Sequence, residues 1–341
     1  MKTVFTTDKL IQLTEKFQSA TNIVIVAHQS PDGDAVGSCL ALQSYLRKKI
    51  TKSITVCLPD PAPATFEWLK GADEMLDAQN HLAEIQEIIS SSTLVFSLDH
   101  NQLSRAGAEL ERMIKEIDPF KVMIDHHLFP SEEYDITFSD TSSCATAQMI
   151  FDFIEANDDL ALIDEEIGEM IYCGIMTDTG SFRFPSTTAH THHVIAKLLE
   201  AGVKNEKVHE AIYDTNSISR LKMRASVTEK MELIEAHKTA LLFLTKEDMH
   251  AYNYQEGDAD GLVNVGLSIK GINKAIFLKE SNDLVKISFR SKGENNPVNE
   301  LASSYFNGGG HANAAGGRFE GSIEDAIKKI KSVLHEFDHK H

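Results

Sequence analysis

The chain has 341 residues, of which 42% are hydrophobic and 25% are charged, an ordinary composition for a folded globular protein. Its formal net charge of −18 argues against a long nucleic-acid duplex as a partner, because phosphate contacts require a basic surface. No apolar run approaches the ~20 residues that span a bilayer, so we expect no membrane partner.

The first part of the chain predicts an α/β domain at residues 1–205. Residues 1–18 alternate charged and apolar residues and predict an amphipathic helix. Short apolar strands then alternate with helical patterns, which is typical of a mainly parallel sheet flanked by helices. The strands are predicted at 22–27, 53–58, 93–98 and 121–124, and the helices at 34–49, 81–90, 106–117, 144–156, 161–177 and 187–201.

The rest of the chain predicts a linker and a second, smaller α/β domain. Residues 206–236 are charged and helical, and we interpret them as a helical linker. The second domain occupies residues 237–341, and two domains suit a chain longer than the about 250–300 residues that one core supports. Its strands are predicted at 239–244, 274–278 and 284–290, and its helices at 298–305 and 322–337.

The cysteines indicate a reducing compartment. Cys39, Cys57, Cys144 and Cys173 are scattered and form no CxxC pair. We expect reduced, mostly buried thiols and a cytoplasmic protein.

The first group of metal-ligand candidates follows strand 22–27. His28, Asp32 and Asp34 stand on a tight loop shaped by Pro31 and Gly33, and an extended loop could direct the two carboxylates at separate ions. Oxygen and imidazole ligands together suit Mn²⁺ better than an all-oxygen Mg²⁺ site. The alternative is that Asp34 only caps the following helix.

Acids and imidazoles follow two further strands. Asp99 ends strand 93–98, where a carboxylate could bridge two ions, although by itself it would suggest a turn. Asp125, His126 and His127 follow strand 121–124. One imidazole could bind metal, the other could reach a substrate phosphate, and Asp125 could ligate or orient them. A surface turn is the alternative.

Two glycine-containing stretches add candidates. Asp178 lies between glycines, and Arg183 beyond it could clamp a phosphate, although Thr-Asp-Thr-Gly alone suggests a turn. Residues 308–317 are rich in glycine and contain one imidazole, and their backbone amides could surround an anion, with a helix cap and turn as the alternative. Three further histidines follow Arg183, at His190, His192 and His193, and we expect them to be solvated.

Together these stretches resemble the DHH phosphoesterase family. Its eponymous triplet stands as Asp125-His126-His127, its first motif as His28 to Ser38, and its fourth as Thr177-Asp178-Thr179-Gly180. Ser288-Phe289-Arg290-Ser291 and Gly308 to Gly317 resemble the DHH-associated substrate-binding domain. The resemblance covers nearly the whole chain and is strongest to the bacterial branch of oligoribonucleases and pAp phosphatases.

The resemblance implies two divalent metal ions as cofactors, with Mn²⁺ preferred. It implies that His127 contacts the scissile phosphate and that Asp125 supports the histidines. One ion would be held by His28, Asp32, Asp99 and Asp178, the other by Asp34, Asp99, His126 and Asp178, and the substrate by Arg290, Ser291, Gly309, Gly310 and His311.

The implied function is hydrolysis of phosphoesters in short single-stranded RNA, cleaved from an end, or in 3′-phosphoadenosine 5′-phosphate. A phosphodiesterase for cyclic di-AMP or pApA is the alternative. A pyrophosphatase is disfavoured because the loop around His311 suits a nucleotide. A catalytically inactive nucleotide-binding regulator would have lost a metal ligand, and every expected ligand is present. A homodimer is compatible with the amphipathic helices.

Overall fold

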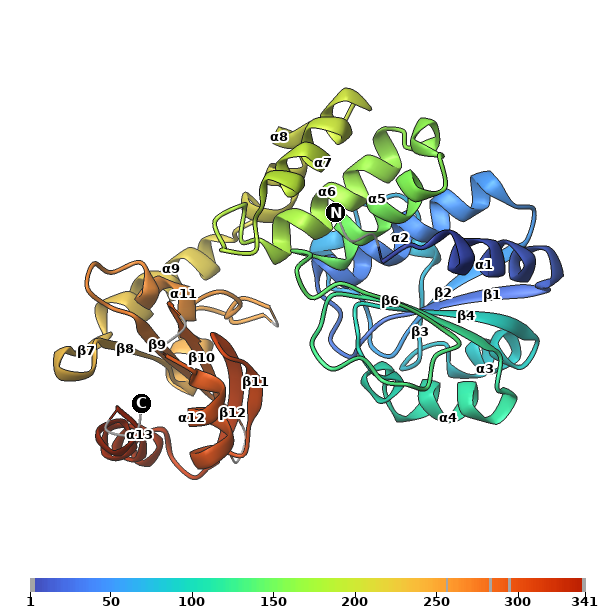
Figure 1. The fold of residues 1–341 in the computed structure, drawn as a ribbon. Coiled ribbons are helices and arrows are strands. Elements are labelled where there is room, and N and C mark those ends of the chain that lie inside the picture. Colours follow the sequence, from blue (N-terminus) through green and yellow to red (C-terminus); the bar gives the residue numbers. More distant parts are fainter. Residues whose placement is uncertain (1–3, 256, 282–283, 294–295, 339–341) are drawn as a thin grey trace. The chain divides into compact units, whose positions relative to one another are not determined.

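The computed structural model describes residues 4–255, 257–281, 284–293 and 296–338. The chain divides into two compact units, Met1–Thr215 and Asn216–His341. The segment predicted as a helical linker is split between them, because α8 (Asn205–Tyr213) belongs to the first unit and α9 (Ile218–Glu229) to the second. Each unit has its own sheet (Figure 1).

The first unit contains a six-stranded parallel sheet in the order β3-β2-β1-β4-β5-β6, which confirms the predicted fold class. Two of its strands, β3 and β6, were not predicted, because runs of two and four residues are too short to show a strand period. The strands are β1 (Asn22–Val26), β2 (Ser53–Leu58), β3 (Leu76–Asp77), β4 (Ser92–Leu98), β5 (Phe120–Asp125) and β6 (Ile136–Ser139).

Helices cover both faces of this sheet, as Figure 1 shows. Successive side chains of β1 enter different cores, Ile23 and Ile25 on one face and Val24 and Val26 on the other. Strands buried on both faces explain the near-continuous apolar runs of the sequence. The core on one face includes side chains of α1 (Thr7–Ser19), α2 (Gly33–Lys49) and α5 (Thr146–Ala156), and of α6 (Glu165–Asp178) and α7 (Ala189–Glu200), which pack on these helices, and the core on the other face includes α3 (Leu82–Ser90) and α4 (Ala108–Ile117).

The strand order reverses between β1 and β4, which are neighbours in the sheet although β2 and β3 separate them in the chain. In open parallel sheets, ligands bind beyond the carboxyl ends of the strands at such a reversal, because the adjacent loops diverge there. His28 follows β1 and Asp99 follows β4, so the topology alone brings these two side chains to the same edge.

The second unit contains a mixed sheet in the order β11-β12-β10-β9-β8-β7. The strands are β7 (Glu232–Ile234), β8 (Thr239–Leu244), β9 (Lys274–Glu280), β10 (Leu284–Ser291), β11 (Gly309–His311) and β12 (Ala314–Glu320). Besides α9, the helices are α10 (Lys246–Ala251), α11 (Val263–Leu267), α12 (Val298–Tyr305) and α13 (Ile323–Asp338). The two faces of the sheet pack into separate cores, one with α12 and α13 and the other with α9 and α11.

The glycine-rich stretch, for which no strand was predicted, forms the antiparallel hairpin β11–β12. Glycine is required where its two arms approach each other. A Cβ on Gly308 would lie 2.0 Å from the Gly316 carbonyl oxygen, and one on Gly310 would lie 2.5 Å from that of Ala314. The glycines therefore allow the two arms of the hairpin to approach each other closely, and anion binding there stays a prediction.

The four cysteines are free and buried, as predicted. Within the described ranges, none of the helices is both long enough and apolar enough to cross a membrane.

Candidate metal centre

Seven of the predicted metal and phosphate ligands meet at the carboxyl edge of the parallel sheet. They form three groups, and within each group the ligand atoms lie within 4.8 Å of one another. Ligands that bind one ion at about 2.0–2.6 Å are separated by no more than about 5 Å, so these groups have the spacing of coordination spheres. The groups are His28, Asp32 and Asp99; Asp34, His126 and Asp178; and Asp99, His126 and His127.

The imidazole of His126 faces three carboxylates. Its Nε2 lies 3.8 Å from an oxygen of Asp34, 3.5 Å from Asp99 and 3.6 Å from Asp178. These acids come from α2, the end of β4 and the last residue of α6, so three separate elements supply them. All members of the second predicted ligand set therefore surround one point.

The first predicted ligand set is assembled in part. His28 Nε2 lies 3.3 Å from Asp99 Oδ2 and 3.9 Å from Asp32 Oδ1. Asp32 also caps α2, since its Oδ1 accepts the backbone N–H groups of Asp34 and Ala35. The proposed alternative that Asp34 caps this helix is wrong, because Asp32 occupies the cap. Asp178 falls in the group around His126.

Both ligand histidines are held so that Nε2 faces the acids. Nδ1 of His28 lies 2.8 Å from the Gln29 carbonyl oxygen, and Nδ1 of His126 lies 3.3 Å from that of Ser143. Because a carbonyl oxygen only accepts, Nδ1 carries a proton, and Nε2 is the atom that would bind a metal once its own proton is lost. Burial alone would lower the two pKa values, but hydrogen bonding to Asp99 raises the pKa of His28 to about 9 and that of His126 to about 10.

Asp99 lies between the two histidines and is 2% exposed. Its φ of +62° is unusual for a residue with a side chain, and Thr146 Oγ1 donates to its Oδ1 at 3.1 Å. Burial would raise the pKa of Asp99, but its hydrogen bonds with His126 and His28 outweigh burial and lower the pKa. Its oxygens face the two ligand groups separately, which fits a bridging ligand.

Asp34 is anchored by a different helix from its own. Its oxygens accept the backbone N–H groups of Thr146 at 2.6 Å and Ala147 at 2.7 Å, at the N-terminus of α5, where the helix dipole favours an anion. Burial, with the nearby Asp99 and Asp178, raises its pKa. Burial also raises the pKa of Asp178, to about 7.

Close packing of α2 against α6 brings Asp34 to Asp178. A Cβ on Gly37 would lie 2.5 Å from the Met170 carbonyl oxygen, and one on Gly174 would lie 2.5 Å from Ala147 Cβ and 3.0 Å from Asp34 Oδ1. Larger residues would force these elements apart and separate the two carboxylates.

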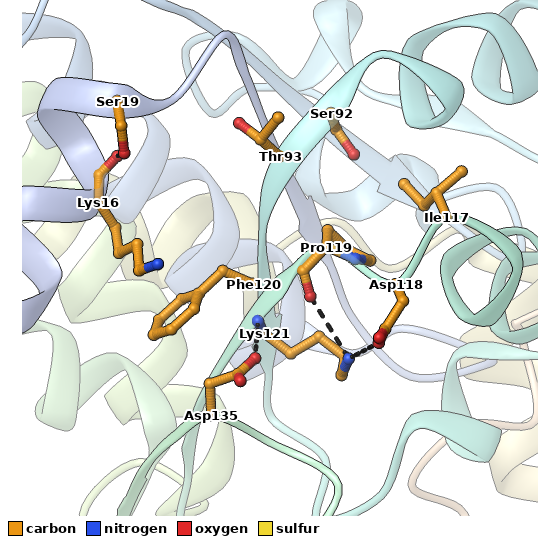
Figure 2. A pocket seen from close by; sticks show the side chains of 10 residues that line it. All are labelled: Lys16, Ser19, Ser92, Thr93, Ile117, Asp118, Pro119, Phe120, Lys121 and Asp135. Atoms are coloured by element: carbon orange, nitrogen blue, oxygen red, sulfur yellow. Dashed lines mark hydrogen bonds and ion pairs between the residues drawn. The ribbon is translucent and has the colours of Figure 1, made fainter.

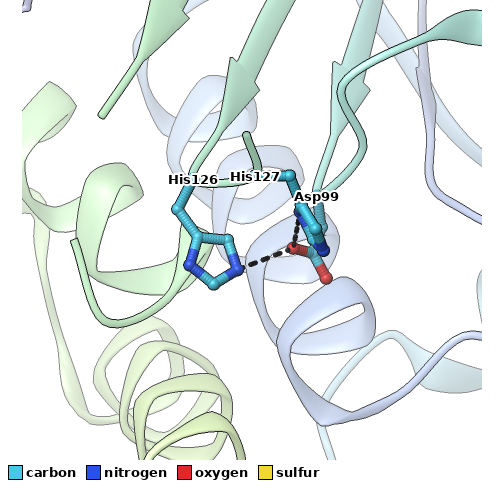
Figure 3. Close-up of side chains that lie close together, drawn as sticks. All are labelled: Asp99, His126 and His127. Carbon is cyan, nitrogen blue, oxygen red and sulfur yellow. Dashed lines mark ion pairs between the residues drawn. The ribbon is translucent and has the colours of Figure 1, made fainter. Parts of the chain in front are cut away.

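Asp125 lies behind the cluster and holds His127. It is fully buried; its Oδ1 lies 2.7 Å from His127 Nδ1, and its Oδ2 accepts the His127 backbone N–H at 3.1 Å. Figure 3 shows His126 and His127 on either side of Asp99. The contact with Asp125 fixes the orientation of the His127 ring beside Asp99.

A divalent cation fits this arrangement. Asp34, Asp99 and Asp178 are brought together, and among the described residues their ion pairs are with histidines, without a lysine or arginine. Converging buried carboxylates repel unless cations balance them. Carboxylate oxygens with imidazole nitrogens are ligands for divalent transition metals.

The predicted substrate residues are divided between the two units, with Arg183 in the first and the others in the second. Arg183 is exposed on the loop after α6, where its Nε donates to the Gly180 carbonyl oxygen at 2.6 Å. Arg290, half-buried on β10, donates to the Phe289 carbonyl oxygen at 2.9 Å, and burial lowers its pKa. The Ser291 hydroxyl bonds within its own unit, to Asn296 and Asn313. Gly309 and Gly310 are exposed on β11, and the side chain of His311 lies outside the described residues.

The sequence did not single out Thr146 or His100, two residues near the metal centre, and the prediction that three histidines are solvated was wrong for His190. Thr146 follows a Ser-Ser-Cys-Ala run, whose helix-start signal was the one available hint. His100 is fully buried, and burial lowers its pKa to about 4, so it is neutral. His192 and His193 are exposed as predicted, but His190 pairs with Asp152 at 2.8 Å because α7 packs beside α5.

A pocket at the opposite edge of the sheet does not belong to this centre (Figure 2). It lies at the amino ends of β4 and β5, between Lys16 and Lys121. The Lys121 ammonium is paired with Asp118 at 2.5 Å, and Lys16 stands over the Phe120 ring. Both of its lysines therefore have partners, and within the described part of the chain no group of metal-ligand residues lies there.

The family follows from comparison with known proteins. The model of the DHH family N-terminal domain matches residues 22–175, and that of the DHHA1 domain matches residues 240–336. The chain belongs to the DHH family of phosphoesterases and is a hydrolase.

Relatives that span most of the chain resemble it at moderate identity. The bifunctional oligoribonuclease and PAP phosphatase NrnA of Thermus thermophilus is 30% identical over 320 residues, 92% of this chain and 89% of that protein. The protein of the same name from Bacillus subtilis is 28% identical over 295 residues, 86% of this chain and 88% of that protein. The crystal structure of an exopolyphosphatase-related protein from Bacteroides fragilis has a TM-score of 0.95 at 35% identity and covers 99% of this chain and 98% of that one.

Proposed function

We propose that the protein is a Mn²⁺-dependent phosphoesterase that hydrolyses short oligoribonucleotides from an end and converts 3′-phosphoadenosine 5′-phosphate to AMP. The observation that carries the proposal is the convergence of Asp34, Asp99 and Asp178 on His126, beside an imidazole buttressed by Asp125. The similarity to NrnA proteins supports the substrate class.

Two divalent ions would be held by His28, Asp32, Asp34, Asp99, His126 and Asp178. Bound there, they would polarise the phosphoryl group and lower the pKa of water at the site. The mixed nitrogen and oxygen ligands favour Mn²⁺.

His127 would contact the scissile phosphate. Asp125 Oδ1 accepts a hydrogen bond from Nδ1 of His127 at 2.7 Å, which fixes the orientation of the ring. An N–H group of this ring would donate a hydrogen bond to a phosphoryl oxygen. Asp125 is therefore a positioning residue for His127.

The substrate-binding residues of the proposal are Arg183 and, in the second unit, Arg290, Ser291, Gly309, Gly310 and His311. The exposed guanidinium of Arg183 suits a phosphate contact. The net charge of −18 favours a short substrate over a long duplex. A cytoplasmic location and a homodimer remain part of the proposal.

A substrate panel tests this function. Purified protein with Mn²⁺ is offered a labelled RNA dinucleotide and pentanucleotide, 3′-phosphoadenosine 5′-phosphate, pApA and cyclic di-AMP. We expect the wild type to hydrolyse the oligoribonucleotides and the bisphosphate. His126→Ala should hydrolyse neither. His192, an exposed histidine on α7, provides the control, and His192→Ala should keep full activity. Dominant turnover of cyclic di-AMP would favour the cyclic dinucleotide alternative. Folded wild-type protein that binds nucleotides but releases no product would indicate an inactive regulator.

A further inference from the structure

Phe129 is exposed directly beside the candidate catalytic histidine. Its side chain is 87% exposed, the highest value among the large apolar side chains of the described residues, and its neighbour Leu128 is 55% exposed. Water contact with an aromatic ring is unfavourable, and exposed apolar groups beside a polar site mark binding surfaces. Phe129 lies two residues beyond His127 in the chain, so its backbone belongs to the loop that follows the DHH triplet.

The loop that carries Phe129 is held in an unusual conformation. Its φ is +61°, a region that bulky residues rarely adopt. Asn101 stabilises it, because its Nδ2 donates to the Leu128 carbonyl oxygen at 2.7 Å and to that of Phe129 at 3.3 Å. The Ser131 backbone N–H also donates to the Asn101 carbonyl oxygen at 2.8 Å. The backbone that carries the exposed ring is thus held by the turn after Asp99, and strain of this kind is concentrated at functional sites.

We propose that Phe129 is a stacking platform for a nucleobase of the substrate, and thereby a specificity-determining residue. The inference rests on the proposed function. Two residues of chain span at most about 7 Å between Cα atoms, so Phe129 is within the reach of one nucleotide, from phosphate to base, of His127. A phenyl ring stacks on every base, which predicts preference for nucleotides over other phosphoesters without selection among bases.

Packing within the first unit does not explain why an aromatic side chain stands at position 129. Phe129 belongs to none of the hydrophobic cores and makes no aromatic contact among the described residues. Its removal therefore leaves the cores intact, and Phe129→Ala should fold as the wild type does.

The test compares three dinucleotides: pApA and two analogues in which one or the other adenine is replaced by hydrogen. For Phe129→Ala we expect kcat/KM on pApA to fall about tenfold, the effect of losing one stacked base. On the analogue that lacks the stacked base, the variant and the wild type should be equal. Phe129→Tyr should retain wild-type values, and Ile11→Ala, which removes a 55%-exposed apolar side chain from α1, should change nothing.

If Phe129→Ala lost the same factor in kcat/KM on all three substrates, the ring would stabilise the loop and would not stack on a base. An unchanged kcat/KM on pApA would also overturn the inference. Binding of pApA in EDTA, measured by calorimetry, separates this inference from the proposed function. If the wild type binds pApA but hydrolyses nothing, the proposed function fails, and a tenfold weaker dissociation constant for Phe129→Ala still supports stacking. Equal binding by both proteins, or none by either, refutes it.

Discussion

Replacing Gly174 with alanine should damage the metal centre through helix packing alone. The added methyl group would lie 2.5 Å from Ala147 Cβ and 3.0 Å from Asp34 Oδ1. Carbon atoms in contact are about 3.5–4.0 Å apart, so α5 and α6 must separate by about 1 Å. Asp34 is bound to the N-terminus of α5 and Asp178 ends α6, so the two carboxylates separate with their helices.

The stability cost and the activity cost differ in size. Overpacking costs about 1–3 kcal/mol, and alanine recovers about 1 kcal/mol relative to glycine in a helix. A net loss of about 1 kcal/mol lowers Tm by about 2–4 °C in a unit of this size. Misplacement of catalytic groups by about 1 Å costs about 100-fold, which we expect in kcat/KM.

Gly168 provides the matched control on the same helix. Its added methyl group would lie 2.5 Å from Val203 Cγ2, away from the metal centre. Thermal denaturation and Mn²⁺-dependent phosphoester hydrolysis are measured for Gly168→Ala and Gly174→Ala. We expect comparable changes in Tm but a large loss of activity in Gly174→Ala alone. Equal activity losses in both variants, or full activity in Gly174→Ala, would refute the reasoning.

Three further predictions concern the centre itself. Asp125→Asn removes the charge that orients His127 and should lower kcat about 10–100-fold with little change in circular dichroism; unchanged kcat would contradict that role. In EDTA, the raised pKa values of His28 (about 9) and His126 (about 10) stabilise the fold fully below pH 6.5, and this effect is lost as pH rises through the folded-state values, so Tm should fall between pH 6.5 and about 10; a Tm that rises there would be inconsistent with the ion pairs. Mn²⁺ at 100 times its dissociation constant should add about 2.7 kcal/mol per bound ion to the free energy of unfolding, seen as a higher Tm than in Mn²⁺-free buffer, and an unchanged Tm would count against a native-state site.

The sequence was sufficient for the parallel sheet because β1, β2, β4 and β5 are continuous apolar runs, each long enough to indicate a strand. The position of acids and imidazoles directly after these runs also placed candidates such as His28 and Asp99 at one edge, since the carboxyl ends of parallel strands coincide there. Neither inference needed side-chain packing.

Long-range packing could not be predicted. The hydrogen bonds from Thr146 and Ala147 to Asp34 join residues more than 100 positions apart and depend on how α5 meets α2. The close approach through Gly174 is equally invisible in sequence, where a glycine within a helix suggests only lower stability. The hairpin β11–β12 was missed because glycine has low strand propensity, and there its role is to allow close backbone approach.

The central claim is that side chains from separate segments form one divalent metal centre, and metal stoichiometry tests it most directly. Wild-type protein and Asp99→Ala are dialysed against Mn²⁺, and bound manganese is measured by mass spectrometry, with circular dichroism to verify folding. We predict two ions per wild-type chain and a loss of both from Asp99→Ala, because Asp99 faces both ligand groups. A folded wild type that binds no manganese, or an Asp99→Ala variant that binds as much as the wild type, would contradict the claim.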